Sequence, residues 1–349
     1  MKKILMFQDY YYVGGIEKII KYLKDNLNNN YKINILSFVN KTNNKIISLL
    51  NKDYRNFFIR NILGIFKLKK YLKNNQYDII HIHSYNSFGL IYAYISKKYI
   101  KKIIIHAHNS NIDKDYLYIK HFINYIIKLL FYNKSYTYIS VSEECSKFCF
   151  GNKKSIILPN MIDYSKYLFN NKERDYYRNL FSINKKDIII GHIGRFEHQK
   201  NHDFIIDIFN DIIKINNNYK LILIGEGSLK NKIKHKVKKL NLESNIIFLD
   251  YRNDISKLIN MFDIYLFPSL YEGFGITVLE AEINSKYVFV SDKISKSLKI
   301  SNRIKYLSLN KSSLEWSKEI INLRKNKIKL NNNLDIANYI IKIKNIYEE

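Results

Sequence analysis

The chain has 349 residues, of which 46% are hydrophobic and 26% are charged. This length predicts about two domains. The composition is that of a globular protein that buries its own hydrophobic cores. This composition therefore excludes a fold whose stability depends on disulfide bonds.

The formal net charge of +27 is shared unevenly along the chain. Residues 1–165 hold 26 basic and 10 acidic residues, whereas the remainder holds 32 and 21. One interpretation is a solvated basic surface in a chain that simply uses Lys, Asn, Ile and Tyr freely. The other is an anionic partner. The excess in the N-terminal half favours an anionic membrane surface or an acidic acceptor.

The sequence predicts a cytoplasmic protein, at most peripheral at the inner face of the cytoplasmic membrane. Gln8 and Asp9 end the first apolar run after four residues, which is too short for a signal peptide. No stretch reaches the roughly 18 apolar residues of a membrane-spanning helix. Cys145 and Cys149 have no histidine pair at zinc-site spacing, so we interpret them as half-buried thiols of a reducing cytoplasm.

Short apolar runs alternate with longer amphipathic runs in two successive series. The apolar runs are continuous, which predicts parallel sheets covered on both faces by crossover helices. In the first series, strands are expected at 4–7, 33–39, 79–83, 103–106 and 136–141, with helices near 16–29, 62–74, 87–98, 117–132 and 143–149. In the second, strands are expected at 188–193, 221–224, 246–249, 264–267 and 287–290, with helices near 203–216, 228–240, 254–261 and 276–284.

The domain boundary is expected where the first series ends. A segment from Leu158 to Asp163 is followed by a polar stretch rich in Tyr, Asn and Lys. The sequence therefore predicts an N-terminal domain of residues 1–163 and a C-terminal domain of residues 164–332. A last helix, 333–349, has no strand after it and could pack back onto the N-terminal domain.

Six of the eleven glycines are expected directly after strands of the second series, in three close pairs: Gly191 with Gly194, Gly225 with Gly227, and Gly273 with Gly275. Glycine permits positive φ and close approach of a ligand to the backbone. Its recurrence at the carboxyl ends of parallel strands indicates one ligand crevice. Tight turns alone would explain any one pair but poorly explain three.

The segment Pro268–Glu280 is the most informative in the chain. It leaves an apolar strand, passes through a Gly-flanked turn and enters a helix. The first N–H groups of a helix favour a phosphate. Glu280, two turns along, could accept hydrogen bonds from a ribose diol, and Glu272, at the mouth, could bind sugar hydroxyls.

Arg195 and Lys200 follow the strand expected at 188–193 and supply positive charge to the same edge. A guanidinium grips phosphate oxygens with two hydrogen bonds, whereas an ammonium acts as a point charge. Together they could neutralise a diphosphate leaving group without a metal ion. Lysine is abundant in this chain, so Lys200 alone could equally be a solvated surface residue.

With these motifs the chain resembles the retaining glycosyltransferases of family 4, most closely their capsular and exopolysaccharide members. The resemblance spans nearly the whole length and rests on an ordered set: Gly14-Gly15-Ile16-Glu17, His106-Ala107-His108-Asn109-Ser110, Val141-Ser142-Glu143, Pro159-Asn160-x-Ile162-Asp163, the Arg195 and Lys200 loop, Gly225-Glu226-Gly227 and the two-glutamate motif. It implies an α/β fold of the GT-B type, with two facing Rossmann-like domains.

The resemblance also implies the roles of individual residues. Arg195 and Lys200 would bind the diphosphate of a nucleoside-diphosphate sugar, and Glu280 would bind its ribose. His108 would contact the transferred sugar near its reacting carbon. The catalytic set is therefore His108, Arg195, Lys200 and Glu272. The remaining donor-binding positions are Gly15, Gly225, Gly273, Phe274, Gly275 and Glu280.

The implied reaction moves a hexose-type unit to a glycan or lipid-linked glycan with retention of configuration. Front-face attack, in which the leaving phosphate takes the acceptor proton, needs no protein nucleophile, no metal and no cofactor. Partners are then the donor, the acceptor and an anionic membrane, without nucleic acid. Two alternatives remain: a GT-B-like epimerase or phosphorylase, and a non-enzymatic basic protein associated with membranes or nucleic acid.

The chain departs from the family pattern at two places. Met161 stands where the family usually has glycine, and Asn284-Ser285-Lys286-Tyr287 replaces a small-Gly-x-Pro step. Neither departure touches the proposed chemistry.

Three other signals are given structural interpretations or kept out of the catalytic set. Asp113 and Asp115 have the spacing of a metal-binding pair but suit the start of a helix better. His81 and His83 alternate at a strand end and so lie on one face, where they could line the acceptor side or be structural. Basic segments at 67–73 and 97–102 interleave lysines with apolar and aromatic residues, as segments that lie on anionic lipid do.

Overall fold

The computed structural model describes residues 1–11, 15–42, 46–54, 56–111, 117–160, 162–323, 327–329 and 336–349. The chain divides into two compact units. Unit 1 comprises Met1–Met161 with Ile336–Glu349, and unit 2 comprises Ile162–Asp335. The boundary expected after Asp163 lies close to this division, and the final helix belongs to unit 1.

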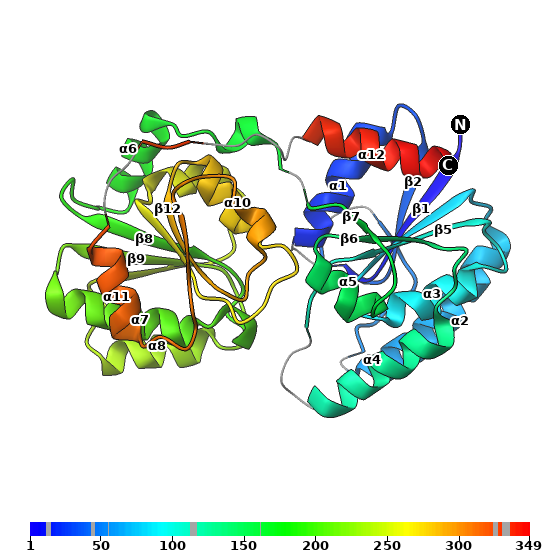
Figure 1. The fold of residues 1–349 in the computed structure, drawn as a ribbon, viewed down its shortest axis with the longest axis horizontal. Helices are drawn as coiled ribbons and strands as arrows, with labels where there is room; N and C mark the ends of the chain where they lie inside the picture. The colour runs from blue at the N-terminus through cyan, green and yellow to red at the C-terminus, as the bar shows by residue number, and fades with distance from the viewer. Residues whose placement is uncertain are drawn as a thin grey trace. The chain divides into compact units, whose positions relative to one another are not determined.

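Unit 1 is a seven-stranded parallel sheet in the order β3-β2-β1-β4-β5-β6-β7. Figure 1 shows α2, α3 and α4 along one face of the sheet and α1 with the C-terminal α12 along the other. Its strands are β1 Lys3–Tyr11, β2 Lys32–Asn40, β3 Ile47–Ser48, β4 Ile79–Ser84, β5 Lys102–Ala107, β6 Thr137–Ser140 and β7 Ile156–Ile157. Its helices are α1 Gly15–Leu27, α2 Phe57–Asn74, α3 Phe88–Ser96, α4 Leu117–Phe131, α5 Glu143–Phe150 and α12 Ile336–Glu348.

Unit 2 is a six-stranded parallel sheet in the order β10-β9-β8-β11-β12-β13. Its strands are β8 Ile188–Ile193, β9 Tyr219–Ile224, β10 Ile246–Leu249, β11 Ile264–Phe267, β12 Tyr287–Ser291 and β13 Ile304–Leu307. Its α-helices are α6 Asn171–Leu180, α7 His202–Ile215, α8 Lys230–Lys239, α9 Ile255–Leu258, α10 Ile276–Ile283 and α11 Ser313–Ile321. Its short 3₁₀ helices are η1 Tyr164–Tyr167, η2 His198–Lys200, η3 Ile259–Met261 and η4 Lys296–Leu298.

The predicted α/β architecture of two parallel sheets is confirmed. The hydrophobic pattern of the sequence did not predict several of the smaller elements. The two-residue strands β3 and β7 carry no detectable pattern, and β13 is a partly exposed strand at the edge of its sheet. Helix α11 begins with a capping box, in which the side chains of Ser312 and Glu315 bond each other's backbone N–H groups. That pattern marks a helix start.

Helix α6 occupies the stretch that was expected to be merely polar. Tyr177 and Arg178 are its buried residues, and polar side chains hold it in place. Arg174 donates to the backbone carbonyls of residues 260–262 and to the carboxylate of Asp263, and Arg178 donates to Asn184 O and Asp187 O. Hydrophobic periodicity cannot reveal a helix that is anchored by hydrogen bonds.

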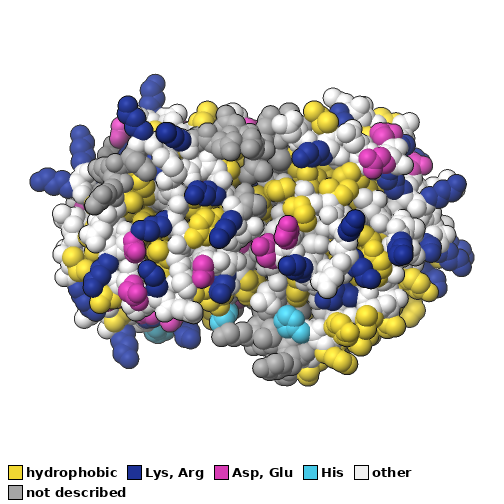
Figure 2. Space-filling model, in the orientation of Figure 1, with side chains coloured by type: hydrophobic (Ala, Val, Ile, Leu, Met, Phe, Trp, Pro, Cys, Tyr) yellow, Lys and Arg dark blue, Asp and Glu magenta, His cyan; other side chains and the backbone are white. Residues whose placement is uncertain are grey.

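Unit 1 exposes large hydrophobic side chains on the helices of one sheet face. Figure 2 shows hydrophobic side chains gathered at the lower right, over the α2 and α4 region of Figure 1. We call these residues the apolar helix face: Phe58, Ile59, Ile62, Leu63 and Phe66 of α2, Tyr94 of α3, and Ile119, Phe122, Tyr125, Leu129 and Leu130 of α4. No helix in the described part of the chain combines the length and hydrophobicity needed to cross a membrane.

Two expectations about buried residues were wrong. Cys145 and Cys149 are fully buried free cysteines rather than half-buried ones. Gly191 lies inside β8 and not at a ligand edge. A Cβ atom on Gly191 would come within 2.2 Å of the Phe262 ring, so this glycine makes room for a core aromatic side chain.

Gly191→Ala should therefore lower the free energy of unfolding by about 1–3 kcal/mol, because an added methyl group overpacks a core that has no space for it. Urea unfolding measures the change. Combining Gly191→Ala with Phe262→Leu should cost less than the sum of the two single changes, since the smaller side chain relieves the clash. Additive losses would contradict the packing explanation.

Candidate active site

The strand order of unit 2 places a topological switch between β8 and β11. From the central β8 the chain builds outward through β9 and β10, then returns to β11 and builds the other way. In such sheets ligands bind outside the carboxyl ends of the strands at the switch. Arg195 and Lys200 follow β8, and Glu272 to Gly275 follow β11, so the predicted donor-binding residues flank this point.

Lys200 and Glu272 form an ion pair at the centre of this edge. The Lys200 ammonium lies 2.5 Å from Glu272 Oε1, with side-chain exposures of only 14% and 10%. The same ammonium lies 4.7 Å from the centre of the Phe267 ring. Limited water makes this attraction stronger than that of a surface pair. The two residues that the sequence assigned to one ligand are thus brought together.

The loops that carry these two residues are bonded to each other. Leu270 N donates to Gln199 O at 2.9 Å, and Gln199 Nε2 donates to Tyr271 O at 3.0 Å. Asn201, in the left-handed region with φ of 57°, donates from Nδ2 to Pro268 O at 3.1 Å. The position of the ion pair is therefore fixed by the backbone on both sides.

Gly225 and Gly227 allow the loop after β9 to pass against the loop after β8. Gly225 has φ of +147°, and a Cβ there would lie 2.2 Å from Gly194 O. Gly227 has φ of +157°, and its Cβ would lie 2.5 Å from Phe196 O. Both glycines thus have a packing role at the predicted crevice, whatever they contact in a ligand.

Gly275 opens α10 as its N-cap, with φ of 73°. Gly273, Phe274 and Gly275 are buried, so their backbone lies at the base of this edge. Val278 N donates back to Gly275 O at 2.9 Å. The other first N–H groups of a helix have no partner within the helix, and the helix dipole adds positive potential there. This geometry suits an anion beside Lys200.

Glu280, the fifth residue of α10, is fully buried. It accepts a hydrogen bond of 2.9 Å from the Tyr167 hydroxyl, and Asn284 Nδ2 in turn donates to Tyr167 O at 2.8 Å. Tyr167 belongs to η1, and no motif in the sequence singled it out. Arg195, by contrast, is exposed.

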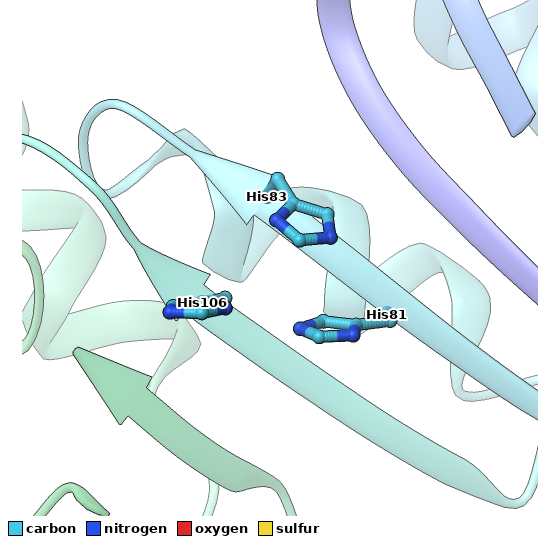
Figure 3. Close-up of side chains that lie close together, drawn as sticks. All are labelled: His81, His83 and His106. Atoms are coloured by element: carbon cyan, nitrogen blue, oxygen red, sulfur yellow. The ribbon is translucent and has the colours of Figure 1, made fainter. Parts of the chain in front are cut away.

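Unit 1 has a corresponding switch between β1 and β4, and four histidines lie beside it. His81 and His83 lie on β4, His106 lies on β5 and His108 directly follows β5, with His83 paired to His106 in register. Figure 3 shows the rings of His81, His83 and His106 gathered over the two strands. All four side chains are buried.

Hydrogen bonds link part of this histidine cluster. His108 Nε2 and His83 Nδ1 are 3.0 Å apart, and His81 Nδ1 shares a hydrogen bond of 2.8 Å with the Tyr347 hydroxyl of α12. Burial lowers the pKa of His81 and of His108 to about 3. These two rings are therefore neutral at pH 7.

The same cluster is the group of residues whose nitrogens could hold a metal. Ligand atoms of His81, His83 and His106 all lie within 4.8 Å of one another, and the described residues contain no other such group. Neutral imidazole is a good ligand for zinc. Asp113 and Asp115, the other pair with metal-site spacing, lie outside the described residues, as does Met161.

Gly15 begins α1 at an exposed position. The notable residue beside it is Glu17, a buried carboxylate that accepts a hydrogen bond of 2.7 Å from Gln8 Nε2. Gln8 lies on β1 and also contacts the Tyr85 hydroxyl at 3.1 Å. The sequence included Glu17 in a motif but gave it no role.

Two family profiles match consecutive parts of the chain: Glycosyltransferase Family 4 over residues 13–166 and Glycosyl transferases group 1 over residues 173–340. The first falls almost entirely within unit 1 and the second almost entirely within unit 2. The chain is a family 4 glycosyltransferase with the GT-B fold. It is thus a transferase enzyme, which excludes the non-enzymatic alternative.

Individual relatives agree with this membership. EpsF of Bacillus subtilis, named as a glycosyltransferase, is 24% identical over 75% of this chain and 69% of EpsF. The UDP-Gal:alpha-D-GlcNAc-diphosphoundecaprenol alpha-1,3-galactosyltransferase of Escherichia coli is 22% identical over 76% of this chain and 72% of its own length. Anabaena HepE, solved with UDP and glucose, has a TM-score of 0.75 at 16% identity, over 92% of this chain and 89% of HepE. At that identity the likeness of HepE shows the fold alone.

The buried histidines should make this glycosyltransferase sensitive to acid. A histidine whose pKa is lowered by folding takes up its proton preferentially in the unfolded state, so stability is complete above the ordinary pKa of about 6.5 and falls as the pH drops below it. As the pH falls, His106→Leu should lose about 1.4 kcal/mol less unfolding free energy per pH unit than the parent protein. Urea unfolding of the parent and of His106→Leu between pH 7 and pH 5 gives, for each protein, the slope of the unfolding free energy against pH. Identical slopes would contradict a lowered pKa of His106.

Proposed function

We propose that this glycosyltransferase moves a sugar from a nucleoside-diphosphate sugar to a glycan or lipid-linked glycan, with retention of configuration, in surface polysaccharide synthesis. The observation that carries the proposal is the shielded Lys200–Glu272 pair beside the start of α10, at the switch point of unit 2. The solved complex of HepE with UDP and glucose supports this donor class. The diphosphoundecaprenol acceptor named for the E. coli relative supports a lipid-linked acceptor.

Each residue of the donor edge has a distinct task in this proposal. The diphosphate replaces Glu272 as the ion-pair partner of Lys200. The Arg195 guanidinium is its second cationic partner. The N–H groups at the start of α10 bind the distal phosphate. Glu272, once released, accepts hydrogen bonds from sugar hydroxyls. Glu280 exchanges its bond from Tyr167 for one from the ribose.

The chemical step needs no protein nucleophile. The bond between the anomeric carbon and the leaving phosphate oxygen breaks, and the acceptor oxygen bonds to that carbon on the same face. The acceptor proton passes to the leaving phosphate. Arg195 and Lys200 stabilise the charge that develops on the diphosphate, so the proposal includes no metal ion and no cofactor. His108 is neutral and positions the sugar through a hydrogen bond.

Isothermal titration tests the donor site. Nucleoside diphosphate should bind with the same affinity in excess EDTA, because the cations are side chains. Arg195→Ala and Lys200→Ala should each weaken binding about 10- to 100-fold, since each removes a charge-assisted hydrogen bond.

Lys214→Ala is the matched control, because Lys214 is an exposed cation of α7 and its loss should leave affinity unchanged. Glu272→Gln should preserve diphosphate binding while abolishing most sugar transfer. Full affinity in both cation variants would overturn the site assignment, and loss of binding in EDTA would overturn the metal-free mechanism.

We also propose that the apolar helix face binds an anionic membrane surface. Lys67, Lys69, Lys70 and Lys73 are exposed on the same α2 helix that exposes Phe66. Basic and aromatic residues together suit the interface of an anionic bilayer, where the apolar groups enter and the lysines pair with headgroups. A lipid-linked acceptor would be reached from this surface.

Flotation with vesicles tests the membrane assignment. The protein should float with vesicles containing phosphatidylglycerol, less so at high salt and hardly at all with pure phosphatidylcholine. Changing Phe66 and Phe122 to Ser should reduce flotation several-fold, because each removes inserted apolar area. Ile215→Ser, at an exposed position of α7 in unit 2, is the control. Equal flotation of the double variant and the parent would exclude this face.

A further inference from the structure

Unit 2 has a second concavity at the opposite edge of its sheet, where the strands begin. A pocket of about 690 Å³ is lined by the first residues of four strands, Ile188, Tyr219, Ile264 and Tyr287. The donor edge lies at the other, carboxyl ends of these strands. The pocket is therefore a separate site, and nothing in the proposed reaction uses it.

Positive charge dominates the lining of this amino-edge pocket. Two carboxylates, Asp187 and Asp263, face five cations: Arg174, Lys185, Lys186, Lys286 and Arg303. Both carboxylates are already engaged. Asp263 pairs with Arg174 at 2.6 Å and accepts from Ile189 N at 2.8 Å, and Asp187 accepts from Asn184 N at 3.0 Å. The lining thus carries more cations than its own acids can neutralise.

Lys286 is the cation that this imbalance affects most. Its side chain is buried, with a relative exposure of 4%. Its ammonium donates to Asn260 O at 3.2 Å and lies 4.6 Å from the centre of the Phe169 ring. No carboxylate of the described residues lies within ion-pair distance of it. Burial, with the nearby Arg174, lowers the pKa of Lys286 to about 7.

The backbone beside Lys286 has an unusual conformation. The position before it, Ser285, has φ of 64°, a conformation that favours glycine. Arg303 NH1 donates to Ser285 O at 2.6 Å, and the Arg303 guanidinium lies 4.6 Å from the centre of the Tyr287 ring. These four residues therefore hold two cations at the pocket wall, at the step where the sequence departs from the family pattern.

We infer that the amino-edge pocket binds a phosphate-bearing anion, with Lys286 and Arg303 as its principal ligands and Lys185 and Lys186 at its rim. A buried ammonium costs free energy unless an anion or several acceptors meet it, and a phosphate supplies both. The volume suits a small organic ligand. A bound phosphate would raise the pKa of Lys286 toward its ordinary value, because an adjacent anion favours the charged form.

The competing explanation is purely structural. Lys286 could serve only to satisfy the carbonyl of Asn260 and to pack on Phe169. A structural role predicts no affinity of the pocket for anions, whereas the proposed site predicts saturable binding. A binding measurement therefore distinguishes the two explanations.

The test is phosphate titration of an Arg195→Ala background, in which the donor edge is weakened. Inorganic phosphate should bind saturably, as followed by isothermal titration. Lys286→Met and Arg303→Gln should each weaken it at least tenfold. Lys305→Met is the matched control, because Lys305 is exposed on β13, pairs with Glu319 and does not line the pocket. The far-UV circular dichroism of each variant reports whether it has folded.

Glucose 1-phosphate is titrated in parallel, to determine whether the pocket binds a sugar phosphate or free phosphate. Tighter binding of the ester would identify a sugar phosphate as the occupant, and equal affinity would identify free phosphate; both support the site. Absence of saturable phosphate binding would overturn the proposal. So would equal affinity in folded Lys286→Met and its parent. The comparison of Lys286→Met and Arg303→Gln with their parent reports on the amino-edge pocket and not on the donor edge, so the proposed function stands or falls separately.

Discussion

The donor edge of unit 2 depends on one shielded ion pair. Bringing Lys200 and Glu272 out of water costs free energy, which their mutual attraction offsets only when the geometry is good. The hydrogen bonds between the loops after β8 and β11 provide that geometry. The Lys200 ammonium and Glu272 Oε1 are held 2.5 Å apart. In the function proposed above, an incoming diphosphate pairs with Lys200 and leaves Glu272 to bind the sugar.

Much of this edge could be predicted because parallel sheets impose their own geometry. Strands revealed by apolar runs must bring their carboxyl ends to one edge, so residues as far apart as Arg195 and Glu272 were expected to be neighbours. Tyr167 could not be predicted, because its bond to Glu280 joins positions 113 residues apart and leaves no local pattern. Gly191 was misassigned for the same reason, since only the fold brings Phe262 against it.

The histidine cluster of unit 1 shows where local periodicity stops being informative. Alternation places His81 and His83 on one face, but the pairing of His83 with His106 and the contact of His81 with Tyr347 are long-range. Through that last contact, the C-terminal helix covers the cluster. Burial lowers the pKa of His81 and of His108 to about 3, so long-range packing, which no local pattern reveals, sets the charge state of these rings.

The positive charge of the chain has two different explanations in different places. A bias toward lysine accounts for cations at exposed positions, where they cost little free energy. It does not account for Lys200 or Lys286, whose ammonium groups are largely removed from water. Glu272 compensates the first. The second donates to the Asn260 carbonyl and lies against the Phe169 ring, and no carboxylate of the described residues is within ion-pair distance of it. If the amino-edge pocket binds phosphate as we propose, the anion is the partner of Lys286 that a compositional bias does not supply.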